Sequence, residues 1–366
     1  MIIREITGFL ESLFPLSYQE SYDNAGLILG DDNKDCTGAI ICLDVTEAIV
    51  QEAMHAGCNL IIAHHPLIFK GLKKINGNGY VEKSIIVAIK NDIAVYAIHT
   101  NMDNVATGVS GRMADRLGLI NRSVLRYHTG NLSKVYTFVP EGKDEELRKA
   151  LFGAGGGMIS HYSECSFNVS GFGTFRAGEG TNPYVGNIGE QHREKEVRVE
   201  MVFPSYLQAK IISSLREVHP YEEVAFDVVE LVNSHPGIGS GLTGDLGKTM
   251  TEEEVLHLIK ERFDLSIIRH TPLTGKMVKK IALCGGAGSF LIPDALHSGA
   301  QFYLSSDIKY HEFFGAEGQL VIADIGHYES EQFTIDLLID LLRQKFNNFA
   351  LLKTGINTNP VKYFPG

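Results

Sequence analysis

The segment AMHAGCNLIIAHHP, residues 53–66, contains the strongest signal for the fold and the first candidate functional residues. Its apolar run 60–63 predicts a short buried strand, which Pro66 ends because proline has no backbone N–H to donate. His64 and His65 therefore stand at the carboxyl end of this strand, where open α/β sheets bind ligands. A metal ion would satisfy the ring nitrogens of both imidazoles. The alternative is a turn with two exposed or hydrogen-bonded histidines.

The same segment recurs near the end of the chain. Residues 53–62 align with residues 295–304 at an offset of 242, with three identities and six conservative pairs. Continued in register, the alignment places the histidine pair opposite Ser306 and Asp307, so both copies have polar side chains at the same strand end. The repeat indicates two related lobes, of which the second lacks the histidine pair.

A second correspondence follows at an offset of 228, where His99 aligns with His327 and Asp103 aligns with Glu331. Each lobe thus has a histidine followed four residues later by a carboxylate, after a predicted strand. Two lobes related in this way would face each other across a pseudo-twofold axis. We expect a site between the lobes, and the full candidate set is His64, His65, Asp103, His327 and Glu331.

Strands alternate with helices in both lobes, which predicts parallel sheets covered on both faces. The expected fold class is α/β, with residues 1–130 as the first lobe and residues 236–366 as the second, packed together as one metal-binding domain. The first lobe is predicted to contain strands 38–44, 60–63 and 93–98 and helices 46–56, 80–91 and 108–117. The second is predicted to contain strands 280–284, 301–304 and 320–325, helices 290–297 and 309–314, and a long helix ending near Lys345.

Residues 131–235 break this pattern and predict an inserted α+β domain of ferredoxin-like type. A loop or crossover is expected at 178–195, and a hinge or turn is expected at Gly237, Gly239, Gly241 and Gly244. The predicted elements of the insert are strands 134–140, 163–170, 174–177, 197–203 and 224–231 and helices 144–152 and 205–218.

Composition narrows the class of protein. The 366 residues include 44 acidic and 33 basic side chains, and the net charge of −11 disfavours sequence-independent binding to the phosphate backbone of DNA. The five cysteines are scattered without C-x-x-C spacing, which is typical of reduced core residues in a cytoplasmic protein. Residues 1–17 predict an amphipathic helix rather than a signal peptide, and no apolar stretch approaches the ~20 residues of a membrane helix.

Imidazoles and carboxylates together suit zinc, iron, manganese or nickel, and the absence of thiolates argues against a structural zinc site. Because successive side chains alternate at a strand end, His64 and His65 are better placed to bind two neighbouring ions than a single one. Two ions about 3.5 to 4 Å apart would hold a water as hydroxide, as in two-metal hydrolases. The competing interpretation is a structural metal site that only joins the two lobes.

The sequence leaves the roles of several other polar residues open. His99 is either a hydrogen-bonded core group, or a residue that orients a metal-binding side chain or faces the substrate. Asp23-Asn24 more often marks a turn than a site, and Asp44, which ends the first strand, calls for similar caution. We find no serine or cysteine nucleophile in a recognisable elbow and no phosphate loop.

Four motifs resemble those of the GTP cyclohydrolase 1 type 2 homologues, also called the Nif-three-like family. They are DNAGL at 23–27, AHHPL at 63–67, HTNMDN at 99–104 and GHYESE at 326–331. The resemblance implies that the five residues of the candidate set are the ligands of a dinuclear metal centre. It also implies that the insert is a PII-like or CutA-type domain, in which the best local match is HPYEE at 219–223.

The resemblance further implies a toroidal homohexamer with its metal sites facing an internal cavity. The family name implies hydrolytic opening of the imidazole ring of GTP with release of formate. Lys70, Lys73, Lys74 and Arg112 are candidates to approach a phosphate. Our main hypothesis is a hydrolase that acts on a nucleotide or a related cyclic amide. The alternatives are a non-enzymatic ring that serves as a scaffold for proteins or as a clamp around DNA, and metal storage or delivery.

Overall fold

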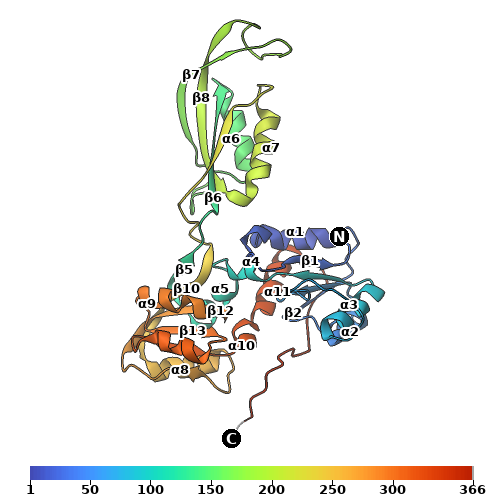
Figure 1. The fold of residues 1–366 in the computed structure, drawn as a ribbon, viewed down its shortest axis with the longest axis vertical. Helices are drawn as coiled ribbons and strands as arrows, with labels where there is room; N and C mark the ends of the chain where they lie inside the picture. The colour runs from blue at the N-terminus through green and yellow to red at the C-terminus, as the bar shows by residue number, and fades with distance from the viewer. Residues whose placement is uncertain (365–366) are drawn as a thin grey trace. The chain divides into compact units, whose positions relative to one another are not determined.

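The computed structural model describes residues 1–364, which form two compact units (Figure 1). The first unit contains residues 1–126 and 237–366, of which 365 and 366 lie outside the described residues, and the second contains residues 127–236. The mixed α/β fold class predicted from the sequence is confirmed. No helix among the described residues is long and apolar enough to cross a membrane.

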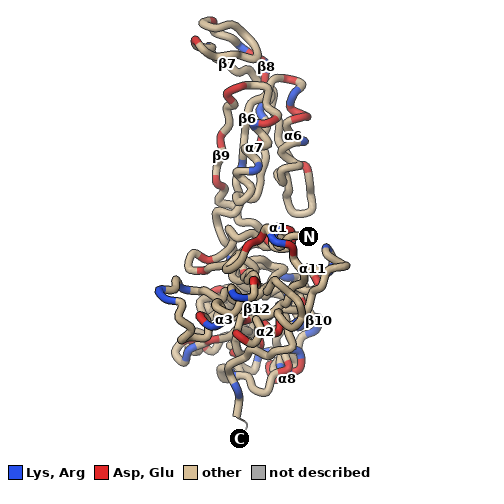
Figure 2. The backbone as a smooth tube through the Cα atoms, turned by 90° about the vertical axis from the view of Figure 1, so that its right-hand side faces the viewer, with Lys and Arg blue, Asp and Glu red and all other residues tan. Residues whose placement is uncertain are grey.

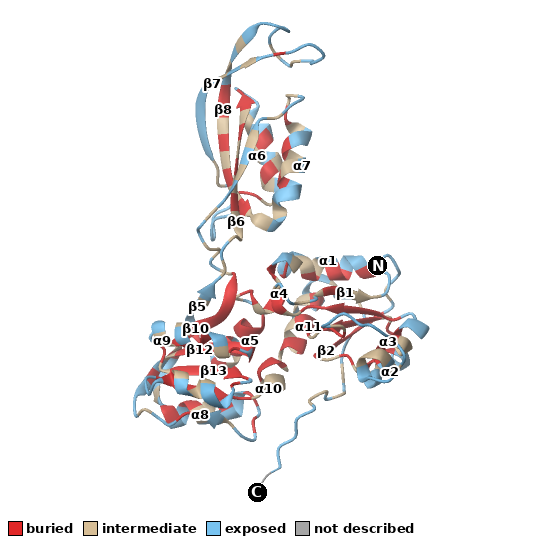
Figure 3. Cartoon of the chain, viewed as in Figure 1, coloured by how far each residue is buried: buried red, intermediate tan, exposed pale blue. Residues whose placement is uncertain are grey.

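The first sheet of the first unit has five strands in the order β1-β4-β3-β2-β15. Strands β2, β3 and β4 are buried on both faces because helices cover each side, as Figure 3 shows. Helices α1 and α11 pack on one face and α2 and α3 on the other. Strand β15 extends the parallel pairing at β2, whereas β1 pairs antiparallel with β4. The bounds are α1 Ile3–Leu13, β1 Gly26–Leu29, β2 Ala39–Cys42, α2 Glu47–His55, β3 Leu60–Ala63, α3 Tyr80–Lys90, β4 Ala94–Ala97, α11 Thr334–Lys345 and β15 Leu351–Lys353.

The second sheet has six strands in the order β11-β14-β13-β12-β10-β5. Its parallel strands β12, β13 and β14 lie in the same order as β2, β3 and β4 of the first sheet. In each sheet the last of these strands has an antiparallel neighbour, which is β11 beside β14 and β1 beside β4. Helices α5 and α8 pack on one face and α9 on the other. The bounds are α4 Thr100–Asp103, α5 Val109–Leu117, β5 Ile120–Tyr127, β10 Gly239–Thr251, α8 Glu252–Arg262, β11 Arg269–His270, β12 Met277–Ala287, α9 Ile292–His297, β13 Phe302–Ser306, β14 Val321–Asp324 and α10 His327–Glu331.

Several details of the first unit differ from the sequence prediction. The predicted long last helix is two helices, α10 and α11, with a break at Gln332 and Phe333. Gly239, Gly241 and Gly244 lie inside β10 and not in a hinge. The predicted helix 309–314 is a 3-10 segment, Tyr310–Ala316.

The second unit has the element order β6-α6-β7-β8-α7-β9 and one antiparallel sheet in the order β7-β8-β6-β9. Helices α6 and α7 cover one face of this sheet, and β7 is exposed along most of its length (Figure 3). The predicted strands 163–170 and 174–177 are a single strand, and β8 begins at Gln191, inside the predicted loop. The bounds are β6 Leu132–Pro140, α6 Asp144–Gly153, β7 Phe167–Arg176, β8 Gln191–Pro204, α7 Gln208–Val218 and β9 Phe226–Glu230.

Candidate metal centre

The five predicted ligands lie at the ends of short elements of the first unit. His64 and His65 follow β3 directly, and their backbone N–H groups donate to Cys42 and Leu43, which continues the parallel pairing past the end of the strand. Asp103 is the last residue of the short helix α4. The remaining two residues, His327 and Glu331, begin and end α10.

Glu331 connects the set, because its buried carboxylate contacts three of the histidines. Its Oε2 lies 2.9 Å from Nε2 of His65 and 3.2 Å from Nε2 of His327, and its Oε1 lies 3.7 Å from Nε2 of His64. On the other side, Nε2 of His64 lies 3.6 Å from Oδ1 of Asp103. The structure therefore brings all five predicted residues together, from both sheets of the first unit.

His99 lies beside this group, since its ring centroid is 5.4 Å from that of His64 and 5.5 Å from that of His65. A ring nitrogen from each of these three histidines lies within 4.8 Å of the other two. A second group with the same spacing contains His65, His327 and Glu331. Two overlapping groups of candidate metal ligands thus share His65.

Each of the four imidazoles is already held at Nδ1. The partner is the Ile98 carbonyl for His64, and a carboxylate for each of the other three. Metal-binding histidines show this pattern, because a hydrogen bond at one ring nitrogen fixes the tautomer and directs the other nitrogen to the ion. The four distances are 2.8 Å for His64 to Ile98, 2.8 Å for His65 to Asp44, 2.7 Å for His99 to Asp23 and 2.8 Å for His327 to Asp307.

Two buried polar atoms test whether these residues fit a cation. Nε2 of His64 and Oδ1 of Asp103 are buried and have no hydrogen-bond partner among residues 1–364. Leaving such atoms unpaired costs about 1 to 3 kcal/mol each. A nitrogen lone pair and a carboxylate oxygen facing the same point are the donors that a first-row divalent ion prefers. The residues present therefore fit a divalent metal ion.

Gly286 makes room for the Glu331 carboxylate. A Cβ atom at Gly286, where φ is +64°, would lie 2.4 Å from Oε1 of Glu331. The hydroxyl of Ser306 donates to the Gly286 carbonyl at 2.6 Å, and the Gly286 N–H donates to Oγ of Ser330 at 3.0 Å. Ser306 is the residue that aligns with His64, so the second copy of the repeat uses this position to hold the backbone beside the ligand.

The close packing of histidines and carboxylates shifts the pKa values of several side chains in the cluster. Burial lowers the pKa of His65, but the Glu331 and Asp44 carboxylates outweigh it and raise that pKa to about 10. Burial also lowers the pKa of His327, and Asp307 and Glu331 raise it to about 11. For Asp103, burial raises the pKa to about 7. The carboxylates thus favour positive charge at this point, which a bound cation would supply in competition with protons.

A cavity of about 480 Å³ opens beside His65 and His327. The segment after β15 forms part of its wall: the Thr358 hydroxyl donates to Oδ2 of Asp44 at 2.7 Å, and the Asn359 amide donates to Glu329 at 3.0 Å. Arg269 also lines the cavity, where its guanidinium pairs with Asp324 at 3.1 Å and stays largely exposed. This cavity is large enough for a nucleobase-sized molecule.

The sequence does not assign the orienting carboxylates this role. It favours a turn at Asp23, calls for similar caution at Asp44, and presents Asp307 only as an alignment partner of His65. A usable signal exists for the last two, since Asp44 ends a predicted strand and Asp307 lies at the strand end of the repeat. Arg112, a candidate phosphate contact, instead pairs with Asp340 at 3.3 Å.

Fold and site together define a class of α/β proteins in which histidines and carboxylates at strand ends meet in one candidate metal centre. The chain belongs to the Duf34/NIF3 (NGG1p interacting factor 3) family, whose model matches residues 1–360.

Named relatives and a solved structure are similar over nearly the whole chain. A Bacillus subtilis (strain 168) protein named GTP cyclohydrolase 1 type 2 homolog is 36% identical over 327 residues, which cover 89% of this chain and 88% of that protein. A protein of the same name from Halalkalibacterium halodurans is 35% identical over 364 residues, 98% of each chain. The crystal structure of a Bacillus cereus protein related to NIF3 has a TM-score of 0.87 at 37% identity and covers 100% of this chain and 99% of its own.

Proposed function

We propose that His64, His65, Asp103, His327 and Glu331 bind two divalent cations in a centre that hydrolyses a nucleotide or a related cyclic amide. The observation that carries the proposal is the convergence of three imidazoles, each fixed at Nδ1, on the buried Glu331 carboxylate beside two unpaired buried atoms. Zinc, iron, manganese and nickel all suit these donors. When bound, such ions activate a water molecule and polarise the group that it attacks.

The protein residues would divide the remaining work. His99, held at Nδ1 by Asp23 and facing His64 and His65, is placed to hold or move a proton at its other ring nitrogen. The cavity next to His65 and His327 would hold the substrate, with Arg269 as the cation available to an anionic group. The relatives' name, GTP cyclohydrolase 1 type 2 homolog, makes GTP the first substrate to test.

The test combines metal analysis with a turnover screen on nucleotides, starting with GTP, for the wild-type protein and the His64→Ala variant. A matched control is His55→Ala, which removes an exposed histidine in the last turn of α2. We expect about two ions per chain and turnover in the wild type and in His55→Ala, and loss of both in His64→Ala. Equal turnover of GTP by wild type and His64→Ala would show that the reaction takes place elsewhere.

A structural metal site is the second candidate, favoured by the burial of Glu331 and His64 between elements of both sheets. It predicts two tightly held ions, no turnover of any nucleotide and a large fall in melting temperature on chelation. Readily exchangeable ions without turnover would instead support metal storage or delivery.

The organisation of the chain completes the proposal. We propose that residues 1–130 and 236–366 are pseudosymmetric lobes of one metal-binding domain and that residues 131–235 are a PII-like or CutA-type insert. The order of the strands β7-β8-β6-β9 and of the helices between them supports this, since it is the split βαβ arrangement. We place the protein in the cytoplasm.

Assembly as a toroidal homohexamer is part of the same proposal, and light scattering of the purified chain tests it. A ring acting as a protein scaffold is the non-enzymatic version of this proposal. A DNA clamp is disfavoured because basic and acidic residues are intermixed along the backbone in Figure 2 and the net charge is −11. Salt-dependent binding to a DNA duplex would contradict this view.

A further inference from the structure

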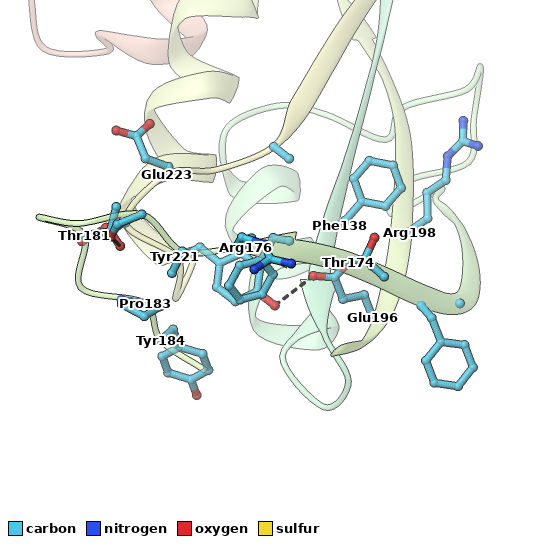
Figure 4. A pocket seen from close by; sticks show the side chains of 18 of the residues that line it. Phe138, Thr174, Arg176, Thr181, Pro183, Tyr184, Glu196, Arg198, Tyr221 and Glu223 are labelled. Carbon is cyan, nitrogen blue, oxygen red and sulfur yellow. Dashed lines mark hydrogen bonds between the residues drawn. The ribbon is translucent and has the colours of Figure 1, made fainter. Parts of the chain in front are cut away.

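The cavity of about 480 Å³ beside the candidate metal centre is the place where the chain can select a substrate, because His65 and His327 line it. A larger cavity of about 640 Å³ lies in the second unit, where the Tyr221 hydroxyl donates to Glu196 at 2.8 Å (Figure 4). None of the five candidate ligands lines that larger cavity. Recognition of a substrate at the proposed centre therefore depends on the side chains of the smaller cavity.

Four carboxylates line the smaller cavity, and their partners distinguish one of them from the other three. The paired carboxylates are Asp44 with His65 at 2.8 Å, Asp307 with His327 at 2.8 Å and Asp324 with Arg269 at 3.1 Å. The fourth is Glu329, which forms no ion pair within the part of the chain that the structure describes. Glu329 is therefore the lining carboxylate whose charge remains for a ligand.

Neutral groups hold Glu329 in place. The Asn359 side-chain amide donates to its Oε1 at 3.0 Å, and the Tyr363 hydroxyl forms a second hydrogen bond with the carboxylate. A Cβ atom at Gly326, where φ is +93°, would lie 2.2 Å from Oε2, so the glycine leaves room for this carboxylate. An ionised carboxylate has about four lone-pair sites, and these two contacts use two of them. Glu329 is thus oriented and still able to accept hydrogen bonds.

Apolar side chains provide surface for a flat ring in the same cavity. Ile267, Val361 and Tyr363 line it and are 53%, 54% and 44% exposed. The first lies between α8 and β11, and the other two lie in the segment after β15. Small-molecule sites typically combine such apolar surface with a few polar groups that fix the orientation of the ligand. Here the unpaired polar group is a carboxylate.

A carboxylate with free acceptor sites suits a ligand edge that has two parallel N–H donors. Guanine has such an edge on its six-membered ring, at N1 and the 2-amino group. Hypoxanthine lacks the amino group, and xanthine has a carbonyl oxygen in its place, which a carboxylate repels. This edge lies at the end of the base remote from the imidazole ring, so a base held there leaves the imidazole ring free to react.

We propose that Glu329 selects guanine-type bases by accepting hydrogen bonds from N1–H and the 2-amino group of a base bound in the 480 Å³ cavity. The inference rests on the proposed function, because it assigns the base specificity of the same site. Glu329 acts as a specificity-determining residue and is not one of the five proposed metal ligands.

The test measures binding of the 5′-monophosphates of guanosine, inosine and xanthosine, which share one ribose phosphate and differ at C2 of the base. Calorimetry or ligand-detected NMR on the full chain as purified should show the guanosine compound binding at least about tenfold tighter than the inosine compound, and the xanthosine compound binding most weakly.

In Glu329→Gln the preference for guanosine over inosine should fall below about threefold, because the amide has one acceptor oxygen and places N–H groups against the donors of the base. Glu253→Gln is the matched control, since it neutralises an exposed carboxylate in the first turn of α8 that does not line the cavity. It should keep the wild-type preference.

Asn359→Ala separates recognition of the base from anchoring of the segment after β15. It removes one contact of Glu329 and keeps the carboxylate, so the preference for guanosine should remain. Loss of the preference in this variant would overturn the proposal, because Glu329 would then act only by holding that segment. Equal binding of the guanosine and inosine compounds by the wild type, or no binding of any of the three, would also overturn it.

Metal content and turnover of the same preparations test the proposed function separately. Selective binding of the guanosine compound without hydrolysis of GTP would support the role of Glu329 and remove the hydrolase. Hydrolysis of GTP and inosine triphosphate with equal kcat/KM would keep the hydrolase and overturn the selection of the base by Glu329.

Discussion

Each of the four clustered histidines is held at Nδ1 before any ligand is considered, and this sets how single substitutions should act. A ring whose tautomer and orientation are fixed loses little entropy when its other nitrogen binds a cation. Removing the group that fixes a ring should therefore weaken binding without removing a ligand. Such substitutions separate the contribution of orientation from that of coordination.

We expect Asp44→Asn and Asp307→Asn to lower metal affinity by about tenfold to a hundredfold, because each carboxylate holds one imidazole at Nδ1. Competition with a chelator of known affinity measures the change. Asp92→Asn, which alters an exposed carboxylate paired with Lys34, is the control and should have no effect. Unchanged metal affinity in both test variants would mean that packing alone keeps the His65 and His327 rings in their orientation.

Gly286→Ala should displace the Glu331 carboxylate and reduce bound metal. The control is Gly299→Ala, because both glycines have positive φ, +64° and +73°, but a Cβ atom at Gly299 meets nothing within 4 Å. Both variants should lose about 1 to 2 kcal/mol of stability from backbone strain. Only the first should lose metal, measured by elemental analysis. Equal metal content in the two would place Glu331 outside the centre.

Asp23 should make stability depend on pH. Burial raises the pKa of its carboxyl, but hydrogen bonds from His99 and Thr100 outweigh burial and lower the pKa to about 2. Since the pKa of an unfolded Asp is about 3.9, the ionised form stabilises the fold above that pH. This contribution, about 2 kcal/mol, is lost as the pH falls toward 2. Urea unfolding should show a shallower fall over this range for Asp23→Asn than for wild type.

At the scale of elements, the sequence predicts those helices and strands whose formation depends on a local pattern of apolar residues. The strand at Leu60–Ala63 is confirmed because four consecutive apolar residues before His-His-Pro have no helical continuation. The break between α10 and α11 was missed, because residues 327–345 keep an amphipathic pattern through Gln332 and Phe333. Strand β7 was divided wrongly because Gly171 and Gly173 interrupt its apolar alternation.

The same limit applies to the site. Spacing after strands was enough to choose five residues that the structure brings together, because they follow β3, β4 and β14 at neighbouring strand ends. The hydrogen bond between Asp23 and His99 joins residues 76 positions apart, so no local sequence pattern predicts it. Strand β10 was not predicted either, because four glycines near position 240 indicate a turn when the pairing with β12 is not known. Helix α8, which follows β10 directly, was not predicted with it.

The segment after β15 provides an element-scale prediction. A chain that ends at Ile356 loses the Thr358 and Asn359 contacts and with them one wall of the 480 Å³ cavity. We expect the metal content to remain unchanged, because none of the five proposed ligands is removed, while turnover of the substrate falls at least about tenfold. Loss of the metal on truncation would show that this segment supports the ligands and not the substrate.

At the scale of the whole molecule, both connections to the second unit leave from neighbouring strands of one sheet. Strands β5 and β10 are adjacent, and Asn121 contacts Asp245 while Ser123 contacts Thr243, so the strands run antiparallel. Replacing residues 128–236 with a short Gly-Ser linker would therefore connect two strand ends that already pair. We expect the shortened chain to fold and to bind metal with wild-type stoichiometry.

Elemental analysis of the purified shortened chain measures its bound metal. A shortened chain that folds but holds no metal would make the insert a part of the metal centre. Light scattering on the same sample reports whether residues 128–236 are needed for assembly.

Ser306 also has an evolutionary consequence. If the two lobes descend from one duplicated ancestor, the position after the middle strand now supplies an imidazole in one copy and a hydroxyl that holds the Gly286 carbonyl in the other. Under that descent the two side chains cannot replace each other: Ser306→His would lose the contact with the Gly286 carbonyl, and His64→Ser would lose the imidazole that faces Asp103. A single substitution would therefore damage the site from either copy.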